Sequence, residues 1–218
     1  MRALNPNSAI SLIGDLVLSR EHDDQKALFL LLDETLTRVN QQLAPLQPLA
    51  ITIGDEFQGA FGELPAALEA ALQVQLRLKG SSEVRIGLGW GEIEALAEER
   101  LPLAQTGTAW WSARAALERV ASLRAKKRWP NTVRTLIAGP DPTLAAVVNA
   151  HLLCSDHLVA KMSVEDAKIT LGLLRGASQN ELGEELGISQ ASISRRQVEN
   201  GPSTLYRAHK ELEKGLDS

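Results

Sequence analysis

Two apolar segments of the chain each contain acidic residues that would be costly to bury. Asp15 lies inside the run AISLIGDLVL, and Asp55 and Glu56 are adjacent in the segment ITIGDEFQGAF. A carboxylate inside an apolar strand needs a partner, because removing an isolated charge from water is very unfavourable. The candidate partners of Asp15 are Arg20 or another buried base, backbone amides, or a metal ion.

The chemistry of these three carboxylates favours a hard cation. Asp15, Asp55 and Glu56 offer only oxygen donors, which suit Mg²⁺ or Mn²⁺, and substrate phosphates often complete the coordination of such ions. We therefore predict a Mg²⁺ or Mn²⁺ site at these residues. For Glu56 the alternative is a solvated residue of a turn.

Groups that bind phosphate are expected close to the same carboxylates. The segment after Asp15 leads into a predicted helix, and the amides at a helix N-terminus attract anions. A second source is the segment from Arg114 to Arg134, with seven basic residues against Glu118 alone. This basic run could hold phosphates or a DNA backbone; the alternative is a solvated helix end. The predicted phosphate-binding residues are Gly14, Leu16, Val17, Ser19, Arg20, Gly54, Lys126 and Lys127.

An α+β domain is predicted to position these residues. The apolar patterns indicate a strand at 9–18, a helix at 23–45, a hairpin at 49–61, a helix at 63–80, a strand at 83–93, a helix at 107–127 and a strand at 132–139. This order predicts a ferredoxin-like antiparallel sheet with packed helices, in which Asp15 and Asp55 meet at one end of adjacent strands. Gly87, Gly89 and Gly91 remove one row of side chains, so another group is expected to approach that face closely.

A second, all-helical unit is predicted after residue 162. The pairs Ser163/Asp166 and Ser178/Glu181 have the spacing of capping boxes, and Gly187 provides a turn before a second cap. We predict three parts: a nucleotide- and metal-binding domain at 1–140, a connecting helix at 141–162, and a helix-turn-helix DNA-binding domain at 163–218. The predicted DNA-binding residues are Ser189, Gln190, Ser192, Arg195 and Arg196.

The net negative charge of the C-terminal unit argues against strong DNA binding by a single copy. Residues 163–218 contain seven basic and nine acidic residues, so a single copy is expected to bind DNA weakly, and two copies in a dimer would double the contacts. The alternative is a three-helix bundle with a structural role only.

Residues 9–138 resemble the catalytic domains of class III nucleotidyl cyclases and of GGDEF diguanylate cyclases. The resemblance is carried by the segments ISLIGDLVLSR, ITIGDEFQGAF, VRIGLGWGEI and GTAWWSARAALERV. With its GDLVLSR opening and its C-terminal helix-turn-helix, the whole chain resembles the SatD family of bacterial proteins. The resemblance implies Asp15 and Asp55 as metal ligands, ATP or GTP as the bound purine nucleotide, and a homodimer.

Three positions depart from the cyclase pattern. Ile51 stands where those cyclases select the purine with a Lys, and Trp111 and Ala115 stand where an Asn and an Arg stabilise the transition state. Arg114, one residue away, is the candidate catalytic residue if the chain is an enzyme. The resemblance therefore supports nucleotide binding better than turnover. Trp110 and Trp111 are expected in a core or a dimer interface.

The main hypothesis is a nucleotide-responsive DNA-binding transcriptional regulator. The alternative is an active nucleotidyl cyclase or another nucleotide-converting enzyme with an appended helix-turn-helix, and a third option is a dimerisation platform.

Composition sets the remaining expectations. A hydrophobic content of 44% is enough for a core, the net charge of −4 gives no general attraction to nucleic acid, and the single cysteine, Cys154, fits a reducing compartment. No stretch is expected to cross a membrane and no signal peptide is recognised, so we predict a cytoplasmic protein. His151, Cys154 and His157 point in different directions on a helix, and no zinc site is expected there.

Overall fold

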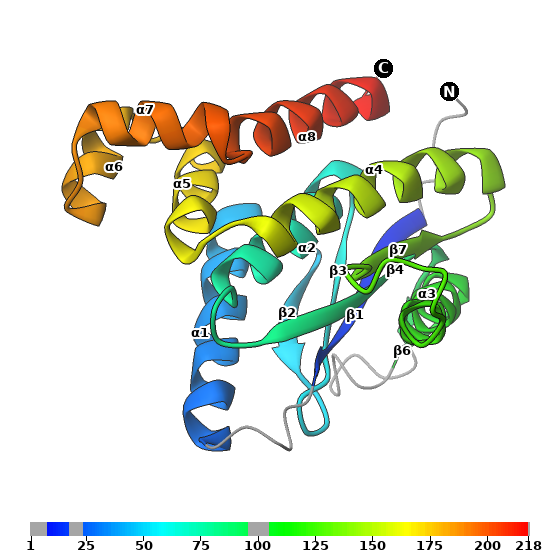
Figure 1. The fold of residues 1–218 in the computed structure, drawn as a ribbon. Coiled ribbons are helices and arrows are strands. Elements are labelled where there is room, and N and C mark those ends of the chain that lie inside the picture. The colour runs from blue at the N-terminus through cyan, green and yellow to red at the C-terminus, as the bar shows by residue number, and fades with distance from the viewer. Residues whose placement is uncertain (1–7, 18–23, 96–104, 218) are drawn as a thin grey trace.

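The five-stranded sheet that carries the predicted site is the centre of the computed structural model, which describes residues 8–17, 24–95 and 105–217 (Figure 1). Its strand order is β2-β3-β1-β4-β7. The strands are β1 Ser8–Val17, β2 Gln47–Ile51, β3 Phe57–Phe61, β4 Glu83–Glu92 and β7 Thr135–Ala138, and a separate small sheet pairs β5 Glu94–Ala95 with β6 Gln105–Thr106. β1 pairs antiparallel with β3 and β4, whereas β7 joins β4 in parallel. The predicted α+β fold with a ferredoxin-like sheet and packed helices is confirmed, and the sheet is antiparallel, as predicted, except at β7.

Helices cover both faces of this sheet. Their bounds are α1 Gln25–Leu43, α2 Leu64–Arg77, α3 Thr108–Arg124, α4 Pro142–Lys161, α5 Val164–Leu174, α6 Gln179–Leu186, α7 Gln190–Glu199 and α8 Pro202–Asp217. α1 and α2 bury the main core against one face, with Leu12, Leu32, Phe57 and Ile86 fully enclosed. α3 lies on the opposite face, where Trp110 and Leu117 pack on Ile13. Trp110 is thus a core residue, as expected, and Trp111 is 65% exposed.

The glycine row of β4 is occupied by α3. A Cβ atom on Gly87 would lie 2.1 Å from the carbonyl oxygen of Ala113, and one on Gly89 would lie 2.0 Å from that of Ala109. Real Cβ atoms do not approach backbone atoms this closely, so the helix can sit on the strand only because these side chains are absent. The predicted close approach is confirmed, and the group that approaches is a helix.

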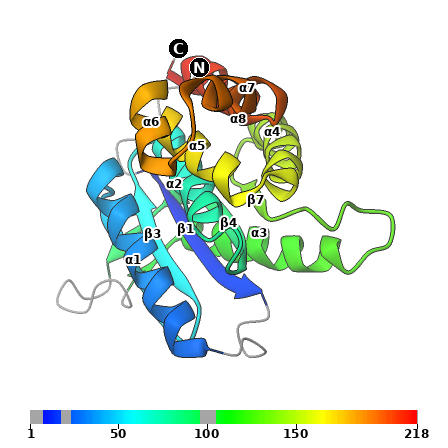
Figure 2. The ribbon, with the colours of Figure 1, turned by 60° about the vertical axis from the view of Figure 1, so that its left-hand side comes forward.

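The C-terminal helices have the predicted caps. Ser163 with Asp166 and Ser178 with Glu181 form capping boxes at the starts of α5 and α6. Gly187 ends α6 in the left-handed conformation at φ +67°, and Ser189 caps α7. α5 and α8 pack on α2, with Leu72, Leu76, Met162, Ala167 and Leu205 in a shared cluster (Figures 1 and 2).

The connecting helix α4 is the most apolar long helix of the described residues. By length and composition alone, its 20 residues could cross a membrane. This is weak evidence, since a core helix of a soluble protein passes the same test. The apolar stretch escapes notice in the sequence because Asp156 interrupts it, and that carboxylate is in fact buried.

Candidate nucleotide and metal site

Asp15 is held by an arginine that the sequence reasoning did not single out. In the antiparallel register of β1 and β4, Asp15 lies opposite Arg85, and both side chains are on the face toward α3. Arg85 Nε donates to Asp15 Oδ1 at 2.7 Å, and a terminal nitrogen donates to Oδ2 at 2.6 Å. Both side chains remain partly accessible, at 22% for Asp15 and 29% for Arg85. Of the partners considered for Asp15, the structure shows a basic side chain, and it is Arg85.

Glu56 is held in the same way from α3. Arg114 donates to its two carboxylate oxygens at 2.6 and 2.7 Å. The hairpin tip is shaped by two backbone bonds, from Thr52 N to Glu56 O at 2.8 Å and from Glu56 N to Ile53 O at 3.0 Å, and Gly54 adopts φ +64°. Glu56 is therefore an ordered, paired residue at the tip and not only a solvated one.

The carboxylates of the two segments interact electrostatically. Burial raises the pKa of Asp15, Arg85 opposes the shift, and the charges of Asp55 and Glu56 raise it further. The hydrogen bonds that Arg114 donates to Glu56 raise the pKa of Arg114, and the charge of Asp15 adds to this effect. The carboxylates at the end of β1 and at the tip of the β2–β3 hairpin are thus close enough to repel one another, and Arg85 and Arg114 pair with two of the three.

A hollow of about 320 Å³ opens beside the hairpin tip. It is lined by Leu16, Gln25, Leu28, Phe29, Leu32, Gly54 and Asp55. This volume is at the small end of the usual range for ligand pockets, roughly 300–1,000 Å³. Asp55 borders the hollow, whereas Asp15 faces α3 because side chains alternate along β1 and its neighbour Leu16 points to the α1 side.

The donor chemistry of this end of the sheet fits a hard cation. Asp15 and Asp55 are oxygen donors, and both oxygens of Asp15 are bound by Arg85. Within residues 8–17, 24–95 and 105–217, no three His, Cys, Asp or Glu side chains are gathered as a ready metal-ligand set. The metal site at Asp15, Asp55 and Glu56 stays a prediction.

The predicted phosphate-binding residues are scattered. Gly14 makes room for the Phe57 ring, since a Cβ there would lie 2.3 Å from ring atom Cζ. Leu16 and Gly54 line the hollow, and Val17 is the last residue of β1. Ser19 and Arg20 lie outside the described residues. Lys126 and Lys127 are exposed in the turns after α3.

Most predicted DNA-binding side chains make contacts within the C-terminal helices. Arg196 donates to Asp166 at 2.9 Å, and Asp166 is only 3% exposed. The Ser189 hydroxyl accepts from Ser192 N and lies 3.0 Å from the Ser192 hydroxyl, and Gln190 donates to Gln179 at 2.5 Å. Of the five residues, Arg195 alone has an exposed side chain for which no contact is found within the described part of the chain.

The family of the chain follows from a comparison of its sequence with family models. The SatD family model matches residues 9–214. The chain belongs to the SatD family. No curated protein matches this SatD family chain.

Three solved structures show what the SatD family chain is similar to in shape. The dimeric guanylyl cyclase domain of the RhoGC fusion protein from the aquatic fungus Blastocladiella emersonii is 17% identical, covering 51% of this chain and 74% of that one, at a TM-score of 0.41. A bacterial light-regulated adenylyl cyclase is 16% identical over 60% of this chain and 74% of its own, at 0.42. The adenylyl cyclase CyaB from P. aeruginosa is 15% identical over 51% and 71%, at 0.39. Likenesses at this level carry no conclusion about activity.

Proposed function

We propose that this SatD family chain binds a purine nucleoside triphosphate, ATP or GTP, together with Mg²⁺ or Mn²⁺. The observation that carries the proposal is a cluster of two ion pairs, Asp15–Arg85 and Glu56–Arg114, at one end of the sheet. Asp55 borders a hollow of about 320 Å³ on the α1 side of that end. The three acids outnumber the two arginines, so a cation would be favoured there, and guanidinium groups are strong, charge-assisted donors to phosphate oxygens.

In this proposal Asp15 and Asp55 would hold the metal ion, which would neutralise charge on the phosphates. Arg85 and Arg114 keep the carboxylates of Asp15 and Glu56 in place, and they provide donors within reach of the same end of the sheet. Phe29, which is 46% exposed, is the accessible apolar side chain of the hollow and offers a surface for the flat face of a base.

We propose that the nucleotide is sensed and not converted. The positions expected to stabilise a transition state hold Trp111 and Ala115, and Trp111 is 65% exposed. Arg114, the remaining candidate, is engaged by Glu56. The second candidate function, an active nucleotidyl cyclase or another nucleotide-converting enzyme, is favoured by one observation, the location of Arg114 at the predicted metal site.

A sensor needs an output, and we propose that the output is DNA binding by a homodimer through α7. The capped start of α7 and the exposed side chain of Arg195 support this proposal. The pairing of Arg196 with Asp166 reduces the number of side chains available to DNA, because the Arg196 guanidinium is already paired within the chain.

Mass spectrometry separates the sensor from the enzyme. The purified chain is incubated with ATP or GTP, with Mn²⁺, with Mg²⁺ or with EDTA, and the free and retained nucleotides are identified. We expect intact nucleotide retained only with metal. A cyclic or otherwise changed product would favour the enzyme, and Arg114→Ala should then abolish product formation. Retention that EDTA leaves unchanged would contradict the proposed metal-dependent site.

A further inference from the structure

The loop between α3 and β7 carries charge that no other part of the proposed function uses. Residues 125–131, with the sequence AKKRWPN, are all exposed, and they place Lys126, Lys127 and Arg128 in succession before Trp129. We call this segment the basic loop. Figure 2 shows it standing out from the body of the molecule, on a different part of the surface from α7.

The three cations of the basic loop are uncompensated. No ion pair joins Lys126, Lys127 or Arg128 to another residue within the described ranges. The cations on either side of the loop differ in this respect, because Arg124 and Arg134 both bind Glu83, at 3.0 and 2.5 Å. A local charge of +3 thus projects from a chain whose net charge is −4.

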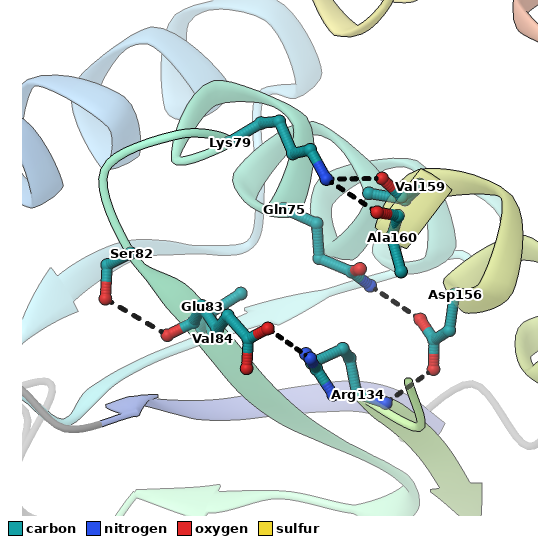
Figure 3. A pocket seen from close by; sticks show the side chains of 9 residues that line it. All are labelled: Gln75, Lys79, Ser82, Glu83, Val84, Arg134, Asp156, Val159 and Ala160. Atoms are coloured by element: carbon teal, nitrogen blue, oxygen red, sulfur yellow. Dashed lines mark hydrogen bonds and ion pairs between the residues drawn. The ribbon is translucent and has the colours of Figure 1, made fainter. Parts of the chain in front are cut away.

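The base of the loop is clamped by two ion pairs to Glu83 and by the buried carboxylate of Asp156. Glu83 bonds the last residue of α3 and the entry to β7 through Arg124 and Arg134. Asp156 of α4, 1% exposed, accepts from the backbone N–H groups of Arg134 and Thr135 at 2.7 and 2.9 Å. Figure 3 shows Glu83, Arg134 and Asp156 around a cavity of about 80 Å³.

The loop is also ordered internally. Lys126 N donates to Leu123 O, and Trp129 N donates to Lys126 O, both at 3.0 Å. The Arg134 guanidinium donates to the carbonyl oxygen of Asn131 at 2.5 Å. A surface held in one conformation before its partner arrives loses less entropy on binding, so these bonds favour a binding role over that of a freely solvated helix end.

We propose that the basic loop binds single-stranded nucleic acid. Adjacent cations match the closely spaced phosphates of a nucleic-acid backbone, and an accessible indole is a stacking platform for an unpaired base. Trp129 is 37% exposed, so part of its ring is available. It is the one large apolar side chain of the loop, and the loop therefore lacks the broader apolar surface that insertion into a membrane uses.

The test is binding of a fluorescent oligo(dT) or oligo(U) to the full chain, followed by anisotropy across a range of salt concentrations. Each cation that neutralises a phosphate of a single strand contributes about 0.7 to the slope of log K against log salt, so Lys126→Gln, Lys127→Gln and Arg128→Gln together should lower the slope by about 2. We expect this triple variant to lose at least tenfold in affinity near 0.1 M salt. Trp129→Ala should lose about fivefold or more with the slope unchanged.

Two further variants separate the loop from net charge. The matched control removes the same charge elsewhere, through Lys26→Gln, Lys161→Gln and Lys168→Gln, three exposed lysines, and should bind as the unaltered chain does. Glu83→Gln removes a negative charge, which by itself favours a polyanion, but it also releases the clamp. We expect weaker binding from this variant.

Three outcomes would overturn the proposal. One is equal loss of affinity in the loop triple variant and the control triple variant, which would assign binding to net charge. Another is no binding of either oligonucleotide by the unaltered chain. The third is binding of vesicles that contain anionic lipid without binding of nucleic acid, which would assign the loop to a membrane surface. Circular dichroism of each variant verifies that it is folded.

Discussion

Replacing Gly89 by Ala tests how β4 and α3 position the site. The new Cβ would lie 2.0 Å from the Ala109 carbonyl oxygen and 2.2 Å from Ala113 N, and ordinary contacts begin at 3.4 Å. Because both obstructing atoms belong to the helix backbone, α3 must lift by about 1.4 Å, the difference between 3.4 and 2.0 Å. Such a shift would also lengthen the bonds from Arg114 to Glu56, now 2.6 and 2.7 Å, beyond hydrogen-bonding distance.

The expected loss of stability is at the upper end of the overpacking range, about 3 kcal/mol. For a chain of this size that corresponds to a fall in Tm of roughly 6–12 °C. Urea unfolding followed by circular dichroism measures the change. Gly62→Ala is the matched control, because a Cβ there has its first neighbour at 3.7 Å, and its free energy of unfolding should change little. If the two variants have the same stability within about 0.5 kcal/mol, the reasoning about the glycine row is wrong.

Three other predictions concern the buried carboxylate of Asp156 and the ion pairs made by Arg85 and Arg196. Burial raises the pKa of Asp156 to about 6, so the folded state binds this proton more tightly than the unfolded state does. Relative to Asp156→Asn, the chain should gain about 2 kcal/mol of stability as the pH falls from 7 to 4, measured by urea unfolding at each pH. A difference in stability that does not change with pH would contradict the assignment. Arg85→Gln should strengthen Mn²⁺ binding in the absence of nucleotide by several-fold, since Arg85 competes for both Asp15 oxygens. The same variant should weaken nucleotide binding at saturating Mn²⁺. Calorimetry that shows both affinities falling would point to a structural role only. Arg196→Ala should lower the free energy of unfolding by about 1–3 kcal/mol, because it leaves the buried Asp166 without its cation. Arg195→Ala should leave stability unchanged and lower the affinity for double-stranded DNA. Equal stability of the two variants would refute this distinction.

The local features of the fold were predictable from the sequence. The capping residues Ser163, Ser178 and Ser189 act within three residues of their own helix starts, so spacing alone identifies them. The alternation of Gly87 and Gly89 likewise predicts a bare face on β4, whatever packs against it.

Long-range pairings were less accessible. Arg85 lies on the same face as the glycine row, which the sequence shows, but its pairing with Asp15 depends on β1 lying next to β4 in one register. In the same way, the sequence of α7 predicts Arg196 to be a groove-facing cation, whereas in the structure it is paired with Asp166 of α5. The partner of a charged side chain depends on which opposite charge the tertiary packing brings close to it, and the sequence does not reveal that.

The central claim is that Asp15 and Asp55 hold a metal ion for a bound nucleotide. The most direct measurement is isothermal titration calorimetry of ATP and GTP into the chain with saturating Mn²⁺, for Asp15→Asn and Asp55→Asn, with Asp33→Asn on the exposed face of α1 as the charge-matched control. We predict that both site variants lose metal-dependent binding by at least tenfold while Asp33→Asn binds as the unaltered chain does. Equal affinity in all four proteins would contradict the claim.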